Sequence, residues 1–275
     1  MSGTLFVVGT PIGNLGDMTE RARETLGSVE LVAAEDTRRT GRLLAHLGIK
    51  RRLVSLFEGN ERERIASIVA ELREGKDVAL VSDAGMPSIS DPGFLLVRAC
   101  TEESIDVRVV PGPSAVTAAL VVSGLPIDRF TFEGFLPRKA GERRERLRSL
   151  AEDPRTLVLF ESPRRLRALL RDVVAELGDR RVAVARELTK LHEQVLRGPA
   201  SEVAERLGKD DPKGEIVLVV EGRRGQDTPG LDELVAEAAR LVGGGMRKRE
   251  AASAVARERG GSANAIYEAL TRSAR

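Results

Sequence analysis

The sequence predicts an α/β protein: two α/β domains followed by a small helical domain at the C-terminal end. Three observations support this fold class. Through residues 1–124, short β-branched and apolar runs alternate with helix-like segments, which indicates a mainly parallel, doubly wound sheet. In residues 125–224 the strand signals lie closer together, which favours a mixed sheet with hairpins. Residues 230–275 have a helical pattern throughout.

The first domain contains five expected strands and five expected helices. The strands are 4–8, 30–34, 52–56, 78–82 and 107–110, each a short apolar run suited to burial on both faces. The helices are 19–26, 40–47, 61–74, 93–102 and 114–123. Asp91 and Pro92 suit the N-cap and the first position of the fourth helix.

The second domain is expected to hold strands 130–133, 156–161, 181–186, 193–196 and 216–220, with helices 142–151, 164–177 and 200–207. The polar segment 221–230, with Gly and Pro, is typical of a linker. In the tail, helices 247–258 and 263–272 flank Gly260 and Gly261. This outline fits a helix-turn-helix, and it fits equally a plain pair of packed helices.

Composition and missing motifs exclude several classes of protein. The chain has 275 residues, 41% hydrophobic and 31% charged, with a net charge of +2, as in a globular protein that is no polycation. One Cys and two His exclude an internal disulfide and argue against a zinc site. Neither a P-loop nor the dinucleotide-binding glycine pattern occurs. Without a leader pattern or a run of roughly 18 apolar residues, we expect a cytoplasmic protein that uses no metal and no membrane.

Three strand-to-loop junctions of the first domain are rich in Gly, Pro and Ser: residues 9–15, 82–87 and 111–115. The carboxyl ends of parallel strands share one sheet edge, where open α/β sheets bind ligands. Gly13 lets the backbone approach a ligand, and the Asp83 carboxylate accepts hydrogen bonds. We expect one crevice lined mostly by backbone, for a small neutral or zwitterionic molecule. Alternatively, Asp83 caps its own loop and Ser114 is an ordinary helix N-cap.

At the ends of several expected strands, carboxylate and cationic side chains follow one another closely in the sequence. They could provide a proton acceptor beside phosphate anchors, or they could form ordinary salt bridges. A lysine would serve as a base only if its pKa were lowered. The catalytic candidates are Asp36, Glu161, Glu187 and Lys190.

Basic residues are clustered although the net charge is small. Loop 135–141 places Phe135 beside Arg138 and Lys139, a combination suited to RNA backbone and base contacts. Aromatic residues are only 3% of the chain, so recognition would depend mainly on arginine and shape. The candidate RNA-binding residues are Arg38, Arg39, Arg138, Lys139, Arg164, Arg165, Arg247, Lys248 and Arg249.

Six segments in register resemble a known family. They are TPIGNLGDMTERA, AAEDTRRTGRLL, LVSDAGMPSISDPG, VPGPSAVTAAL, FEGFLPRK and ARELTK, and the resemblance runs from about residue 5 to 222. The order of these segments resembles that in the tetrapyrrole methylase superfamily. Their residues resemble those of its branch of bacterial 16S rRNA (cytidine-2′-O)-methyltransferases. Two departures are Met86, where the branch usually has Thr, and residues 56–60, which replace a more His-rich stretch.

The resemblance implies S-adenosylmethionine-dependent 2′-O-methylation of a cytidine in the decoding region of 16S rRNA. It implies cofactor contacts at Pro11, Asp83, Ala84, Gly85, Met86, Ser114 and Ala115, with the second domain closing over the cofactor near Phe160 and Glu161. The implied partners are 16S rRNA or the small ribosomal subunit, with a homodimer as the assembly. Two alternatives stay open: a tetrapyrrole C-methyltransferase, and a noncatalytic RNA-binding assembly factor that would leave the three junctions unexplained.

Overall fold

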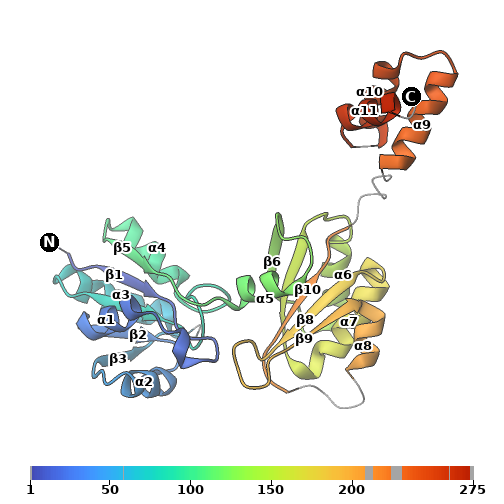
Figure 1. Cartoon of the computed structure of the whole chain (residues 1–275). Helices are drawn as coiled ribbons and strands as arrows, with labels where there is room; N and C mark the ends of the chain where they lie inside the picture. Colours follow the sequence, from blue (N-terminus) through green and yellow to red (C-terminus); the bar gives the residue numbers. More distant parts are fainter. Residues whose placement is uncertain (1, 58, 208–212, 224–230, 260, 273–275) are drawn as a thin grey trace. The chain divides into compact units, whose positions relative to one another are not determined.

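The structure is a computed structural model that describes residues 2–57, 59–207, 213–223, 231–259 and 261–272 (Figure 1). The chain forms two compact units, Met1–Gly222 and Arg223–Arg275. The expected linker falls largely on residues 224–230, which lie outside the described residues, as does Gly260.

The first sheet has five parallel strands in the order β3-β2-β4-β1-β5. The strands are β1 (Leu5–Val8), β2 (Leu31–Ala34), β3 (Arg52–Ser55), β4 (Val78–Val81) and β5 (Val107–Val110). Every residue of β2 and β4 is buried, as expected where helices cover both faces of a sheet. The predicted parallel sheet is confirmed.

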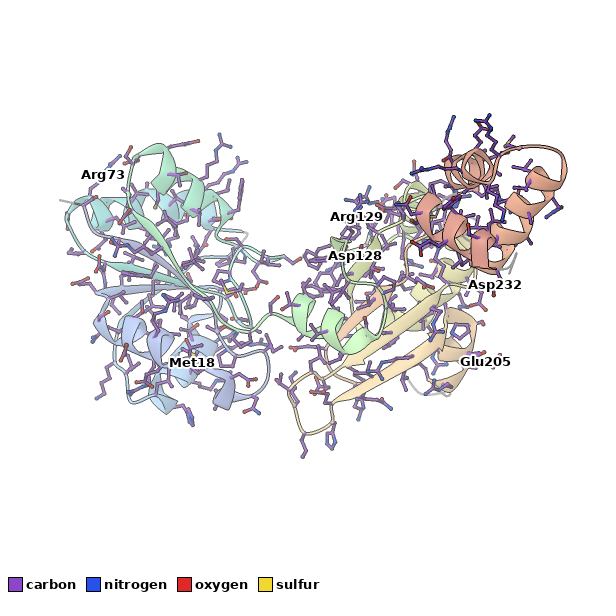
Figure 2. The ribbon with its side chains drawn as sticks, turned by 45° about the horizontal axis from the view of Figure 1, so that its top comes forward. Met18, Arg73, Asp128, Arg129, Glu205 and Asp232 are labelled. Atoms are coloured by element: carbon purple, nitrogen blue, oxygen red, sulfur yellow. The ribbon has the colours of Figure 1, made fainter. Side chains whose placement is uncertain are left out.

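Helices cover both faces of this sheet (Figure 1). The short 3-10 helix η1 (Leu15–Asp17) follows β1. Helices α1 (Glu20–Ser28) and α2 (Thr37–His46) then share one apolar core with one face of the sheet. On the other face, α3 (Glu61–Arg73) and α4 (Phe94–Glu102) share a second core. Arg73, labelled in Figure 2, ends α3 and pairs with Glu103 beyond α4 at 2.7 Å. The doubly wound arrangement is therefore confirmed.

Two helix starts differ from the prediction. Helix α2 begins at Thr37 rather than at residue 40, because Asp36 is its N-cap and accepts a hydrogen bond from the Arg38 amide at 2.8 Å. Helix α4 begins at Phe94, so the predicted caps at Asp91 and Pro92 are wrong.

The first turn of α4 is capped from a distant part of the chain. Oε1 of the buried Glu61, in α3, accepts hydrogen bonds from the amides of Gly93 at 3.0 Å and Leu95 at 3.2 Å. Gly93 takes the N-cap position with φ 128°, a backbone conformation that favours glycine. This cap comes from tertiary packing, which explains why the local sequence suggested a different one.

The second sheet is mixed, in the order β6-β7-β10-β8-β9. Its strands are β6 (Phe130–Phe135), β7 (Thr156–Glu161), β8 (Arg181–Arg186), β9 (Gln194–Pro199) and β10 (Ile216–Val220). β6 and β7 are parallel and the other pairs are antiparallel, so the predicted mixed sheet is confirmed. A register shift between Phe132 and Gly134 lets β6 continue to Phe135, two residues beyond the predicted end.

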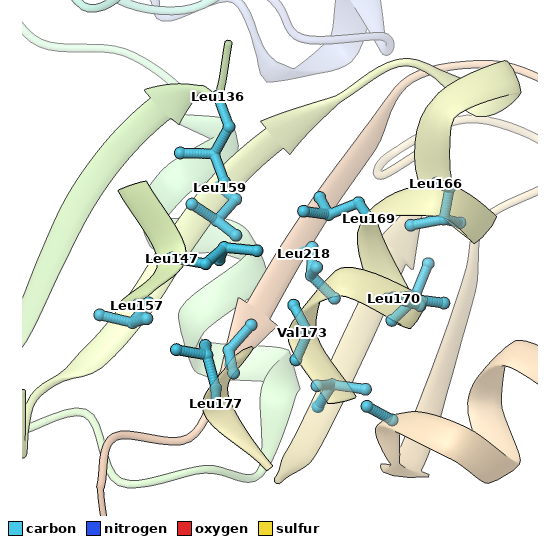
Figure 3. Packing of buried hydrophobic residues seen from close by; sticks show 14 of the residues in the cluster. Leu136, Leu147, Leu157, Leu159, Leu166, Leu169, Leu170, Val173, Leu177 and Leu218 are labelled. Carbon is cyan, nitrogen blue, oxygen red and sulfur yellow. The ribbon is translucent and has the colours of Figure 1, made fainter. Parts of the chain in front are cut away.

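Both faces of the second sheet are also covered. Helices α6 (Ala140–Ser149), α7 (Pro163–Leu177) and α8 (Ala200–Arg206) pack on one face. Figure 3 shows Leu147 of α6 and Leu169 of α7 against Leu159 and Leu218 of the strands. Helix α5 (Ala115–Ser123) packs on the other face, although it precedes the predicted domain boundary at 124/125. That boundary, and the limits of the domains 1–124, 125–224 and 230–275, stay predictions.

The C-terminal unit contains α9 (Leu231–Gly243), α10 (Lys248–Arg259) and α11 (Ala263–Arg272). They surround a core of their own, formed by Leu234, Ala238, Ala251, Ala252, Val255, Ile266 and Leu270. The two predicted tail helices are confirmed to within one residue at their ends. Among the described residues, no helix is both long and apolar enough to cross a membrane.

Candidate functional site

A pocket of about 450 Å³ lies within the first unit, where junctions of the first sheet meet strand ends of the second. All three Gly- and Pro-rich junctions contribute to it, and the second sheet supplies the ends of β6, β7, β8 and β10. The lining residues are Ile12, Glu35, Arg39, 83–86, 89–91, 114–116, Phe135, 160–163, Ala185, Leu188 and 214–217. The predicted convergence of the three junctions on one crevice is confirmed.

Glycines allow the junctions to press together. The backbones of Thr10 and Gly85 exchange two hydrogen bonds, at 2.9 and 3.1 Å, and Gly85 has φ 80°. A Cβ added to Gly9 would lie 2.7 Å from Cα of Gly112, a contact that would push the two backbones apart. The shape of this side of the pocket therefore depends on the absence of side chains.

The pocket is strongly acidic. Among the described lining residues there are five carboxylates and one cationic side chain, that of Arg39; the carboxylates belong to Glu35, Asp83, Asp91, Glu161 and Glu215. Such a lining favours a cationic ligand, because positive charge offsets the mutual repulsion of the carboxylates. The small neutral or zwitterionic ligand expected from the sequence stays a prediction, and the sequence did not indicate that these carboxylates meet.

Asp83 is held by a local network at the end of β4. Its Oδ1 accepts a hydrogen bond from the Asp36 amide at 3.1 Å, and its Oδ2 lies 3.2 Å from Nη1 of Arg39. The Asp83 amide donates to Oε2 of Glu35 at 3.2 Å. These bonds join the ends of β2 and β4 and fix the Asp83 carboxylate at the pocket wall.

Two lining carboxyls have raised pKa values. Burial, reinforced by the negative charges of Glu35 and Asp83, raises the pKa of Asp91 to about 6. Burial also raises the pKa of Glu35. Strained backbone surrounds Asp91, because Ser90 has φ 64° and Gly93 has φ 128°. A carboxyl near neutral pKa in a concave site is a recurring mark of a functional group.

Glu161 ends β7 and its side chain is completely buried, with 0% exposure. Its Oε1 accepts a hydrogen bond from the Ser162 amide at 2.7 Å. Its Oε2 lies 3.2 Å from Nη2 of Arg165, yet within the part of the chain that the structure describes this oxygen has no hydrogen-bond partner. A buried carboxylate oxygen without a donor is costly, so Glu161 has capacity left for a ligand.

The predicted cofactor contacts divide into two groups. Asp83, Ala84, Gly85, Met86, Ser114, Ala115 and Phe160 line the pocket. Pro11 and Gly13 do not, whereas Ile12 between them does. Gly13 faces Lys190 instead, because a Cβ added to Gly13 would lie 2.5 Å from Cγ of that lysine.

Three of the four catalytic candidates do not line the pocket: Asp36, Glu187 and Lys190. Hydrogen bonds from the side chain and backbone of Arg38 lower the pKa of Asp36 to about 2. Such a carboxylate is a weak base; its Oδ1 caps helix α2, and its Oδ2 accepts a hydrogen bond from the Arg38 guanidinium at 2.9 Å.

Lys190 is also unsuited to act as a neutral base. Its Nζ lies 2.8 Å from Oε1 of Glu187 and 3.0 Å from Oε2 of Glu215. Burial alone would lower the pKa of Lys190, but hydrogen bonds to these two carboxylates raise it. The Lys190 hydrogen bond in turn lowers the pKa of Glu187. This trio therefore forms an ion-pair cluster next to the pocket, which corrects the idea of a lysine base.

The candidate RNA-binding residues differ in how free they are. Arg138 and Arg164 are exposed. Lys139 pairs with Glu142 at 3.0 Å. Arg38 pairs with Asp36, although 86% of its side chain is exposed. Arg39 pairs with Asp83 at the pocket wall. Arg165 is only partly exposed and donates to the carbonyls of Leu136 and Pro137, so its assignment to an RNA surface is not supported.

In the C-terminal unit, the basic run lies at the start of α10. Arg247 and Arg249 are exposed, whereas Lys248 donates to the Leu270 carbonyl at 3.3 Å. The Arg249 guanidinium lies 6.0 Å from the ring centroid of Tyr267, at the outer limit of a cation–π contact.

Sequence reasoning missed several lining residues. Glu35 directly precedes the candidate Asp36, and both follow the end of β2 at Ala34, so the strand pattern does not indicate which of the two faces the pocket. Asp91 was assigned to a helix cap, and Glu215 follows a segment that carried no motif. Only the fold brings these carboxylates to the same pocket.

The fold and the pocket place the chain among known enzymes. It belongs to the family of Tetrapyrrole (Corrin/Porphyrin) Methylases, whose profile matches residues 4–204. Uroporphyrin III C-methyl transferase from Thermus thermophilus matches with a TM-score of 0.57 and 20% identity, over 80% of this chain and 97% of that one. Cobalt precorrin-4 methyltransferase matches with a TM-score of 0.59 and 20% identity, over 79% and 94%. At these identities the structural likeness shows the fold.

Sequence relatives indicate one branch of this family. The protein named Ribosomal RNA small subunit methyltransferase I from Thermotoga maritima is 53% identical over 221 residues, 80% of this chain and 99% of the relative. The protein of that name from Escherichia coli O157:H7 is 46% identical over 97% of this chain and 94% of the relative. The one from Mycobacterium tuberculosis is 45% identical over 100% of this chain and 96% of the relative. The resemblance drawn from the six segments is confirmed.

Proposed function

We propose that this protein uses S-adenosylmethionine to methylate the 2′-hydroxyl of a cytidine in 16S rRNA. The observation that carries this conclusion is the similarity, along nearly the whole chain, to proteins named Ribosomal RNA small subunit methyltransferase I. The acidic pocket supports it, because the methyl donor carries positive charge on its sulfonium and on its ammonium group.

The residues present fit this cofactor. A volume of about 450 Å³ is within the usual range for small-molecule sites. Ile12, Met86, Ala115 and Phe160 offer an apolar surface to a flat ring, and the carboxylates offer charge complementarity. The orphaned oxygen of Glu161 calls for a hydrogen-bond donor of the kind the cofactor has. When bound, S-adenosylmethionine supplies an electrophilic methyl group that needs no metal for its activation.

The chain contributes mainly alignment. Holding a hydroxyl in line with a methyl group removes orientational freedom, which lowers the barrier by several kcal/mol. A base that accepts the hydroxyl proton adds about 10²–10⁴-fold. We propose Asp91 for that role in place of Asp36, because Asp91 lines the pocket and its pKa of about 6 is closer to neutral pH.

The substrate is proposed to be 16S rRNA or the small ribosomal subunit. Arg38, Arg138 and Arg164 have exposed guanidinium groups that suit phosphate contacts. We propose a homodimer in the cytoplasm, as the resemblance implies. Light scattering during size-exclusion chromatography would measure the mass of the assembly and test that part directly.

The test of the reaction compares ribosomal RNA from cells with and without the gene. A 2′-O-methyl group protects the adjacent phosphodiester from alkaline hydrolysis, so the deletion strain should lose one protected position. The wild-type gene should restore that position, and an Asp83→Ala variant should not. An unchanged protection pattern in the deletion strain would refute the proposed reaction.

The tetrapyrrole alternative rests on fold likeness at 20–24% identity. It is distinguished by incubating the purified protein and labelled methyl donor with small subunits or with an anionic tetrapyrrole. Label should enter the RNA alone.

A further inference from the structure

The strongest unexplained feature of the pocket is the orientation of Glu161. Ser162 satisfies Oε1 through its amide at 2.7 Å, so the carboxylate is fixed at one end. Its Oε2 is buried, and no described residue donates a hydrogen bond to it. Because the residue lines the pocket, a bound molecule can supply what the protein does not.

Arg165 lies beside this oxygen without donating to it, and the buried Nε of Arg165 also lacks a hydrogen-bond partner among the described residues. Arg165 lies in the first turn of α7, four residues after Glu161. Its Nη2 donates to the carbonyls of Leu136 at 2.8 Å and Pro137 at 3.2 Å. Two carbonyl acceptors account for both hydrogens of that nitrogen. Arg165 therefore attracts Glu161 by charge at 3.2 Å without donating to it. The guanidinium orients the carboxylate and leaves Oε2 available.

A charged donor is the best match for this oxygen. Charge-assisted bonds are roughly twice as strong as neutral ones, and a buried carboxylate needs a partner that offsets its desolvation. Asp83 differs, because an amide and Arg39 already occupy its two oxygens. Within the proposed cofactor, the α-ammonium group is the strong multiple donor, whereas the sulfonium has no N–H.

We infer that Glu161 binds the ammonium group of the methyl donor and that Arg165 is the residue that positions Glu161. This inference rests on the proposed function and assigns an orientation to the cofactor. The amino-acid end lies at the end of β7, against the second sheet.

The test compares three ligands by titration calorimetry, with wild type and Glu161→Gln. S-adenosylmethionine carries two positive charges, on its sulfonium and on its ammonium group. S-adenosylhomocysteine keeps the ammonium without the sulfonium, and methylthioadenosine lacks the whole amino-acid end. Glu161→Gln should weaken the first two ligands by a similar factor, about 10- to 100-fold, and should leave methylthioadenosine unchanged.

The other outcomes overturn the inference. A loss confined to S-adenosylmethionine would assign Glu161 to the sulfonium. Equal losses for all three ligands, or no loss, would remove Glu161 from the ammonium site. If wild type binds none of the three, the proposed function fails instead. Should Glu161→Gln not fold, Glu161→Asp retains the charge, and its shorter side chain should give the same selective pattern with a smaller loss.

The positioning role of Arg165 has its own readout. Arg165→Met should lower the affinity for S-adenosylhomocysteine more than the affinity for methylthioadenosine. Arg165→Lys restores the charge and should recover part of that difference. Arg171→Met, which removes an exposed arginine of the same helix, is the matched control and should alter neither affinity. Equal effects of Arg165→Met on both ligands would show a purely structural role.

Discussion

At the scale of single residues, Asp91 couples cofactor binding to pH. In the free protein its pKa is about 6, so its carboxyl is neutral in mild acid and charged at neutral pH. A cationic ligand favours the charged form and lowers that pKa, so binding releases a proton. The affinity for S-adenosylmethionine should therefore rise as pH increases through about 6.

Calorimetry across this range, in two buffers of different ionisation enthalpy, measures both the affinity and the released proton. Asp91→Asn should flatten the pH dependence, whereas Asp106→Asn, at an exposed surface pair, should leave it as in wild type. Glu35 faces the same pocket and also has a raised pKa. A pH dependence that persists unchanged in Asp91→Asn would assign the proton to Glu35.

The sequence indicated the site at this scale only in part. Asp83, Met86 and Ser114 could be chosen because Gly and Pro mark the junctions that carry them. Pro11 and Ile12 lie in the same loop, and nothing local says which side chain faces inward. Asp91 was beyond reach for a different reason, since its role depends on Glu61 capping α4 in its place.

At the scale of elements, a buried ion pair joins α6 to α7. Nη2 of Arg143 lies 2.6 Å from Oδ2 of Asp172, and both side chains are less than 10% exposed, at 7% and 4%. Asp172→Ala leaves a buried arginine without its main partner, which should destabilise the protein by about 3–5 kcal/mol. Denaturant unfolding measures the change.

Asp106→Ala is the matched control, because it breaks the pair with Arg108, in which both side chains are 63% exposed. Its cost should be about 0–1 kcal/mol. Comparable costs for the two variants would mean that the packing around Asp172 admits water.

The connection between β6 and α6 carries two exposed RNA candidates. Arg138 and Lys139 lie between Phe135, which lines the pocket, and the start of α6 at Ala140. Changing both cations to Ala should weaken binding to 16S rRNA and reduce the slope of log affinity against log salt by about 0.7 per lost phosphate contact. Cofactor affinity should be unchanged.

Filter binding over a series of salt concentrations gives this slope. Arg73→Ala with Arg98→Ala, two exposed arginines that pair with glutamates of the first domain, is the control for general charge loss. If both double variants reduce the slope equally, the β6–α6 connection has no special role.

The elements themselves were largely predictable, because buried parallel strands are short apolar runs that the chain repeats at regular spacing. Strand β6 was predicted too short because a register shift at Gly134 allows it to continue. Helix α5 shows a further limit. It is apolar on most sides, so its pattern does not indicate that it packs on the second sheet.

At the scale of the whole molecule, the pocket and the helical tail belong to separate units. Every lining residue lies within Met1–Gly222, and α9, α10 and α11 have their own core. The Thermotoga maritima relative is covered over 99% of its length by an alignment spanning 80% of this chain, so a protein close to the size of the first unit occurs in the family.

A chain ending at Gly222 should therefore bind S-adenosylmethionine with unchanged affinity. Its affinity for the small subunit should fall severalfold, because Arg247 and Arg249 are removed. Calorimetry and subunit pelleting measure the two quantities, and reversing the charge of Arg247 and Arg249 to Glu in the full chain should reproduce only the second loss. Loss of cofactor binding on truncation would contradict this division of labour, since it would make the tail part of the site.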